Sequence, residues 1–183
     1  MRGARALEER EVLPNSPSMT QRAPETITLP IHEPLRPPPE DWLLAYAAIV
    51  PITAGALSLF VLPDWSATLL PLTLVWAGAI VTFLSGVRRG VSFRMPDGAH
   101  LSQLAMMMWL FLAGIGSILL TGAGRFGLAT ALLLLAYLSL AVLDPIAARR
   151  EEVPNYFAGL RPMQMGLAVV SLAVVGLRVT GWI

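Results

Sequence analysis

The sequence is dominated by five long apolar stretches, separated by short segments that carry most of its charge. A helix needs about 20 apolar residues to cross the roughly 30 Å hydrocarbon core of a bilayer, and each stretch is close to that length. Only 14% of the residues are charged, against about 25% in soluble domains. The sequence therefore predicts an all-α integral membrane bundle of five transmembrane helices, surrounded by the lipid bilayer. The expected domain covers residues 42–183, with spans at about 42–62, 67–87, 101–120, 126–143 and 163–179.

Residues 1–41 differ from the rest of the chain in composition. Prolines recur there among Glu, Arg, Ser and Thr, without a sustained apolar period. A segment that buries so little apolar surface cannot offset the entropy lost on ordering. We predict a disordered, proline-rich cytoplasmic tail, with extended polyproline at Pro37 to Pro39. A proline-rich ligand for a partner protein is the alternative interpretation.

The arginines indicate which way the chain crosses the membrane. Short cytoplasmic loops retain Lys and Arg, whereas translocated loops lose them. With a cytoplasmic N-terminus, the far side receives only Arg125 and Arg178, and the cytoplasmic loops receive Arg88, Arg89, Arg94, Arg149, Arg150 and Arg161. The exclusive use of arginine, with abundant Ala, Leu and Gly, is typical of a GC-rich bacterial genome. We predict a multi-pass protein of the bacterial inner (cytoplasmic) membrane, with its N-terminus cytoplasmic and its C-terminus periplasmic.

Small residues recur every fourth position along the second span. They are Gly78, Thr82, Gly86 and Gly90. Small side chains let membrane helices approach closely, so we expect this helix-packing stripe to face another helix. The partner helix belongs either to this chain or to another membrane protein. Pro51, inside the first span, is expected to kink the helix or free a carbonyl there.

Few side chains in the predicted spans can carry out chemistry. The chain has no cysteine, which excludes disulfides, thiol catalysis and cysteine-ligated metals. The spans offer hydroxyls but no ionisable group near their centres, which argues against a proton relay. We predict no catalytic residue, no cofactor and no metal site. The net charge of +1 also argues against nucleic acid binding.

Three charged residues are expected at one membrane depth on the cytoplasmic side. Arg88 follows the second span, Asp144 follows the fourth, and Arg161 precedes the fifth. The planar guanidinium of arginine suits a carboxylate, so Asp144 is expected to pair with one arginine or the other and to tie helix ends together. We favour this structural role over catalysis. Binding of lipid headgroups by the cytoplasmic arginines is an alternative.

Two parts of the sequence resemble a known family. Residues 79–90 read AIVTFLSGVRRG, which is similar to the signature of the transmembrane protein 69-like family, where ILSFLGG precedes an aliphatic residue, Arg or His, Trp and Gly. The second part is Leu143-Asp144, followed by VPNYF at 153–157 and by Leu160-Arg161. Pro51 and the Pro63-Asp64-Trp65 turn also fit the pattern.

The resemblance extends over about residues 46–175, and the N-terminal tail lies outside it. Ser85 stands where the family has the first glycine of its pair, and Arg89 stands where it has tryptophan. Membership implies a small helical inner-membrane protein, bacterial or mitochondrial, and it implies no known biochemical activity.

The scarcity of chemistry favours a non-enzymatic inner-membrane protein. We expect an accessory or assembly factor that acts through helix packing and contact with another membrane protein. The alternative is a small-solute or lipid transporter with arginines at its cytoplasmic edge. It would need a continuous polar path along Thr82, Ser85, Tyr137 and Ser139. A third hypothesis, an enzyme acting on lipid headgroups, would depend on Asp144.

Overall fold

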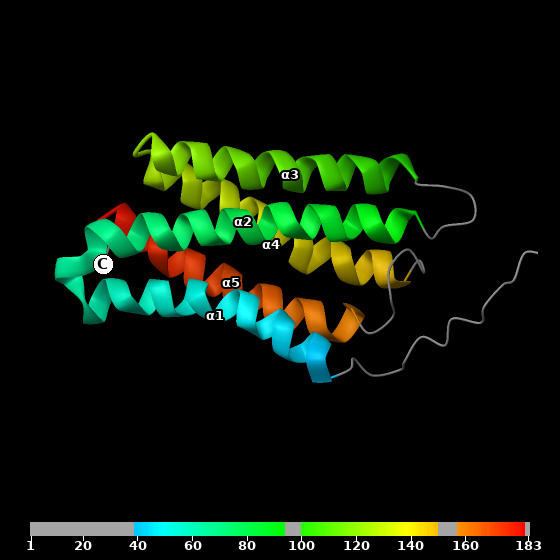
Figure 1. The fold of residues 1–183 in the computed structure, drawn as a ribbon, viewed down its shortest axis with the longest axis horizontal. Helices are drawn as coiled ribbons and strands as arrows, with labels where there is room; N and C mark the ends of the chain where they lie inside the picture. The colour runs from blue at the N-terminus through cyan, green and yellow to red at the C-terminus, as the bar shows by residue number, and fades with distance from the viewer. Residues whose placement is uncertain (1–38, 94–99, 150–156, 182–183) are drawn as a thin grey trace, which may run out of the picture. The chain divides into compact units, whose positions relative to one another are not determined.

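The computed structural model describes residues 39–93, 100–149 and 157–181 (Figure 1). These residues form five α-helices and one short 3₁₀ turn, which confirms the predicted all-α fold. The helices are α1 (Pro39–Val61), α2 (Ser66–Ser92), α3 (Leu101–Gly122), α4 (Phe126–Arg149) and α5 (Phe157–Val179), and the turn is η1 (Pro63–Trp65). The predicted tail lies outside the described residues, except that residues 39–41 belong to α1.

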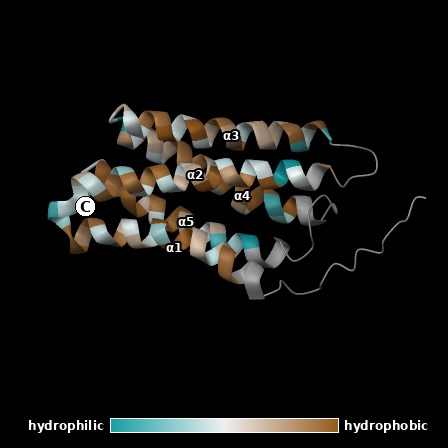
Figure 2. Cartoon of the chain, in the orientation of Figure 1, coloured by the Kyte–Doolittle hydropathy of each residue, from teal (hydrophilic) through white to brown (hydrophobic). Residues whose placement is uncertain are grey.

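Each of the five helices is long and apolar enough to cross a membrane. The chain is therefore a multi-pass membrane protein. Figure 2 shows hydrophobic residues over most of the helical surface and hydrophilic residues gathered toward the helix ends. Large side chains such as Leu43, Phe83 and Leu119 are more than 60% exposed, as expected where the surroundings are lipid rather than water.

Three helices extend beyond the predicted spans. α2 continues to Ser92, α4 continues to Arg149, and α5 already begins at Phe157. The predicted limits followed the loss of apolar residues, but backbone hydrogen bonding does not need an apolar sequence and continues into the polar flank. Asp144 was expected after the fourth span, and this expectation was wrong, because Asp144 lies inside α4.

The connections bring the helices into an up-and-down bundle. The tight η1 turn joins α1 to α2, and α3 ends where Gly124 adopts a positive φ of 71°, which glycine tolerates without strain. There the Arg125 N–H donates to the Leu120 carbonyl at 2.8 Å, so the last turn of α3 is closed as in a Schellman motif. The end of the bundle that holds η1 and the α3–α4 connection is called the turn end below.

The helices close into a ring around one core. α2 packs most extensively on α3, and α4 on α5, while α1 contacts α2 and α5, and α3 contacts α4. α4 and α5 lie behind α1, α2 and α3 in Figure 1. The core is built from Ile, Leu, Val and Ala of all five helices together with Tyr137 and Met165, and it includes the fully buried Ile49, Leu74, Leu110, Leu133 and Leu172.

Candidate functional site

An ionic cluster of Arg88, Asp144 and Arg161 lies at the end of the bundle opposite the turn end. Nη2 of Arg88 on α2 donates to Oδ1 of Asp144 on α4. Nε of Arg161 on α5 lies 3.7 Å from Oδ2 of the same carboxylate. The sequence predicted that Asp144 pairs with one arginine, and the structure places it between both. One carboxylate therefore joins three helices.

The ionic cluster is largely shielded from its surroundings. The side chains of Arg88, Asp144 and Arg161 are 12%, 5% and 10% exposed. Moving a charge out of water is costly unless it is paired in good geometry, so each charge in the cluster depends on the others. The arrangement can fix α2, α4 and α5 in register. It brings no nucleophile or base next to Asp144 among the described residues that would support hydrolysis.

Polar side chains also connect the helices at other depths. Tyr137 on α4 donates to the Ala77 carbonyl on α2 at 3.1 Å, and the Trp109 indole donates to Ser139 at 3.1 Å. Thr53 and Ser171 share a hydrogen bond of 3.0 Å between α1 and α5. Such bonds contribute about 0.6 kcal/mol each on average within membranes, so they set geometry more than stability.

The hydroxyls proposed to line a transport path are engaged within the bundle. Thr82 donates to the Gly78 carbonyl at 2.9 Å, and Ser85 donates to the Thr82 carbonyl at 2.7 Å. Ser139 donates to the Ala136 carbonyl at 2.7 Å, while Tyr137 is fully buried in the core. These contacts give the transporter hypothesis no support from the residues it named.

The helix-packing stripe on α2 is correct for its first half only. A Cβ atom on Gly78 would meet Ser117 Oγ at 2.5 Å and the Gly114 carbonyl oxygen at 3.0 Å, so α2 and α3 touch almost backbone to backbone. Thr82 would in turn collide with a Cβ on Gly114. At these two positions the predicted contact with another helix is confirmed.

For Gly86 and Gly90 the predicted packing within the chain was wrong. Both residues are exposed, and no atom lies within 4 Å of an added Cβ. The reason is the helical repeat: every fourth residue advances about 40° further around a helix of 3.6 residues per turn. A stripe of that spacing therefore leaves the face that packs on α3. The buried face of α2 instead follows steps of three and four, through Leu74, Ala77, Val81 and Leu84.

Two functional contacts were missed from the sequence. Gln164 of α5 is 4% exposed and donates from Nε2 to the Ala45 carbonyl of α1 at 2.6 Å. The Trp76 indole donates to the Ala48 carbonyl at 2.9 Å, next to the Ala47 carbonyl that Pro51 leaves without its helical donor. An amide in the first turns of a span, and a tryptophan 25 residues after a proline, carried no signal strong enough to pair them.

Among the described residues, no group of three or more His, Cys, Asp and Glu side chains is placed to hold a metal ion. No family model, curated protein or solved structure matches the chain. The resemblance to the transmembrane protein 69-like family therefore stays a prediction. The candidate function rests on the bundle itself.

Proposed function

We propose that this chain is a non-enzymatic accessory or assembly factor that binds another membrane protein within the bilayer. The proposal includes the predicted bacterial inner membrane and the transmembrane protein 69-like family. The observation that carries it is the exposed, unfilled surface at Gly86 and Gly90. Together with Ala79 and Phe83 these glycines form what we call the outer face of α2.

The residues of the outer face follow one line along the helix. Ala79, Phe83, Gly86 and Gly90 are spaced by four, three and four residues, and all are exposed. This spacing places residues on one stripe of a helix that meets a second helix at a shallow angle. Phe83 is 66% exposed and projects beside the two glycines, so the face has one large protrusion next to a shallow hollow.

Such a surface suits a protein partner in lipid. Lipid tails are as apolar as the helix, so association depends on close packing, which small residues permit and bulky ones prevent. At Gly78 the same residue type is used for the close contact with α3. The outer face offers a second close contact of this kind, directed away from the bundle. A partner helix that seats against Gly86 and Gly90 would bury the Phe83 ring as well.

The expected effect of Gly86→Leu is the loss of the partner without loss of the fold. The added side chain enters open space on this protein but blocks the approach of a second helix. In mild-detergent affinity purification of the tagged full chain from its native membrane, with mass spectrometry, recovery of a stoichiometric partner should fall by about tenfold, equivalent to about 1.4 kcal/mol of binding free energy. Gly90→Leu should act in the same direction.

Gly166→Leu is the matched control for this experiment. Gly166 lies on α5 and also has no atom within 4 Å of an added Cβ, so the substitution adds the same bulk at another open site. It should leave partner recovery unchanged. If the unaltered protein is recovered alone, or if Gly86→Leu retains the partner, the proposed function is wrong.

The proposed orientation can be tested because the chain lacks cysteine. Asp64 in η1 and His100 before α3 are both exposed and lie at opposite ends of the bundle. With a cytoplasmic N-terminus, Asp64→Cys should react with a membrane-impermeant maleimide in intact cells. His100→Cys should react only after the membrane is permeabilised. The reverse pattern would contradict the orientation drawn from the arginines.

A further inference from the structure

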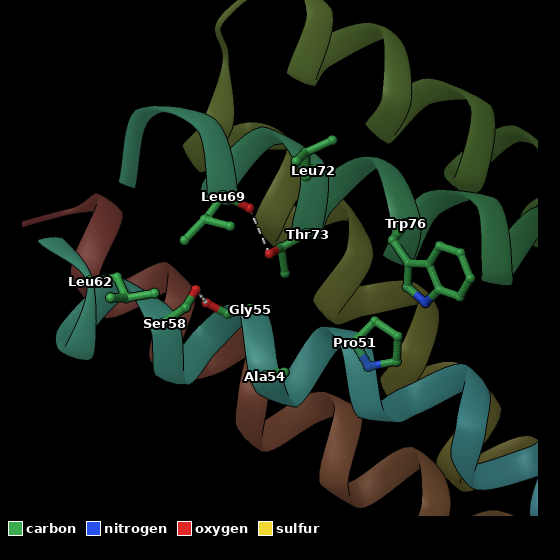
Figure 3. Close-up of a pocket in the computed structure, with 9 residues that line it drawn as sticks. All are labelled: Pro51, Ala54, Gly55, Ser58, Leu62, Leu69, Leu72, Thr73 and Trp76. Atoms are coloured by element: carbon green, nitrogen blue, oxygen red, sulfur yellow. Dashed lines mark hydrogen bonds between the residues drawn. The ribbon is translucent and has the colours of Figure 1, made fainter. Parts of the chain in front are cut away.

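A groove of about 440 Å³ lies between α1 and α2, in the half of the bundle nearer the turn end. Figure 3 shows it running along the two helices, from Leu62 and Leu69 at one end to Pro51 and Trp76 at the other. Gly55 and Thr73 are buried and come so close that a Cβ on Gly55 would overlap the Thr73 hydroxyl. The small Ala54 is exposed beside them. The hollow therefore exists because large side chains are absent from this part of α1.

The polar groups that line the groove are all used inside the protein. The Ser58 hydroxyl donates to the Gly55 carbonyl at 2.7 Å, and the Thr73 hydroxyl donates to the Leu69 carbonyl at 2.7 Å. The Trp76 indole N–H donates to the Ala48 carbonyl. Each donor is thus directed at backbone, and the groove presents hydrocarbon to its occupant. An occupant that brought its own polar groups would leave them without partners in a dry site.

The size of the groove decides between the apolar occupants that a membrane offers. A protein interface commonly uses about 20–30 residues on each side, and a helix with its side chains is about 10–12 Å across. The groove is lined by nine residues. That area is too small for a stable helix contact, whereas an elongated apolar slot within two candidate membrane spans matches a single hydrocarbon chain.

We infer that the groove between α1 and α2 binds one acyl chain of a bilayer phospholipid. The lipid comes from the leaflet at the turn end, and its headgroup lies near η1, where the exposed Trp65 suits the membrane interface. The bound chain contacts Ala54 at the bottom of the groove and ends near Pro51 and Trp76. This site is independent of the proposed partner, because the outer face of α2 lies in the other half of the helix.

The test uses the full chain in phosphatidylcholine vesicles that contain a phosphatidylcholine with a photoreactive diazirine in one acyl chain. After irradiation, mass spectrometry locates the labelled residues. We expect labelling of the groove residues to saturate at one lipid per protein. Ala54→Phe fills the groove from an exposed position, and it should lower groove labelling by about tenfold, equivalent to about 1.4 kcal/mol of binding free energy. Ala54→Leu should give a smaller loss.

Ala131→Phe is the matched control, because Ala131 is likewise exposed but lies on α4. It should leave groove labelling unchanged, and circular dichroism of all three variants should match the unaltered protein. Labelling that rises in proportion to the probe over all exposed faces, and that does not respond to Ala54→Phe or Ala54→Leu, would overturn the site in favour of ordinary surrounding lipid. Cross-links from the groove to a second protein chain would overturn it in favour of a helix partner.

Discussion

Replacement of Asp144 by alanine is expected to lower the free energy of unfolding by about 3–5 kcal/mol. The carboxylate is 5% exposed and is paired with Arg88 and Arg161. Its removal leaves two largely buried guanidinium groups on neighbouring helices, so the substitution loses the pairing and creates repulsion as well. The measurement is unfolding of the purified full chain in mixed detergent micelles, followed by helical circular dichroism.

A double-mutant cycle separates direct pairing from general disruption. Arg88→Ala alone should also be destabilising, and the double variant should lose less than the sum of the two single losses, because groups in one network are coupled. Asp64→Ala, at an exposed position in η1, is the control and should change stability by no more than about 0.5 kcal/mol. Additive losses at Arg88 and Asp144 would show that the pair does not act as a unit.

Gly78→Leu is the second substitution with a large expected effect. An added Cβ already meets Ser117 Oγ at 2.5 Å, Ile118 Cγ1 at 2.8 Å and the Gly114 carbonyl oxygen at 3.0 Å. The carbonyl belongs to the α3 backbone and cannot rotate away, so α2 and α3 would have to separate along the most extensive contact of the bundle. We expect a loss of about 3 kcal/mol or more, seen as failure to recover a monodisperse protein.

The contrast with Gly86→Leu makes this prediction specific. Both glycines lie in α2 and in the same four-residue repeat, yet no atom lies within 4 Å of an added Cβ at Gly86. Gly86→Leu should therefore leave the stability of the isolated protein unchanged, even where it removes a partner. Equal destabilisation by the two substitutions would contradict the packing of α2 against α3.

The number of spans and the ionic cluster were predictable because both depend on strong, simple signals. Burial in hydrocarbon requires long apolar runs, and Arg88, Asp144 and Arg161 interrupt or flank those runs at matching depths. The phase of packing was less accessible. A repeat of four places Gly78, Gly86 and Gly90 on a line in the sequence, whereas the contact in the bundle follows steps of three and four. Only the positions of α3 and α2 together decide which glycine is covered.

Pairings between distant helices could not be predicted for a related reason. The hydrogen bonds from Gln164 to Ala45 and from Trp76 to Ala48 end on backbone carbonyls, which every residue possesses. A sequence marks the donor but gives no mark to the acceptor. The groove between α1 and α2 was missed because it is defined by what Gly55 and Ala54 lack.

The bonds between α1 and α5 bear on how the bundle is made in a cell. Ala45 and Thr53 on the first described helix take their partners, Gln164 and Ser171, from the fifth, more than 110 positions later in synthesis. While the ribosome is still producing the intervening spans, α1 stands in the bilayer with that side open, held only through α2. The ring is completed when the fifth helix arrives, so the bundle is finished by its last inserted part rather than grown outward from its first.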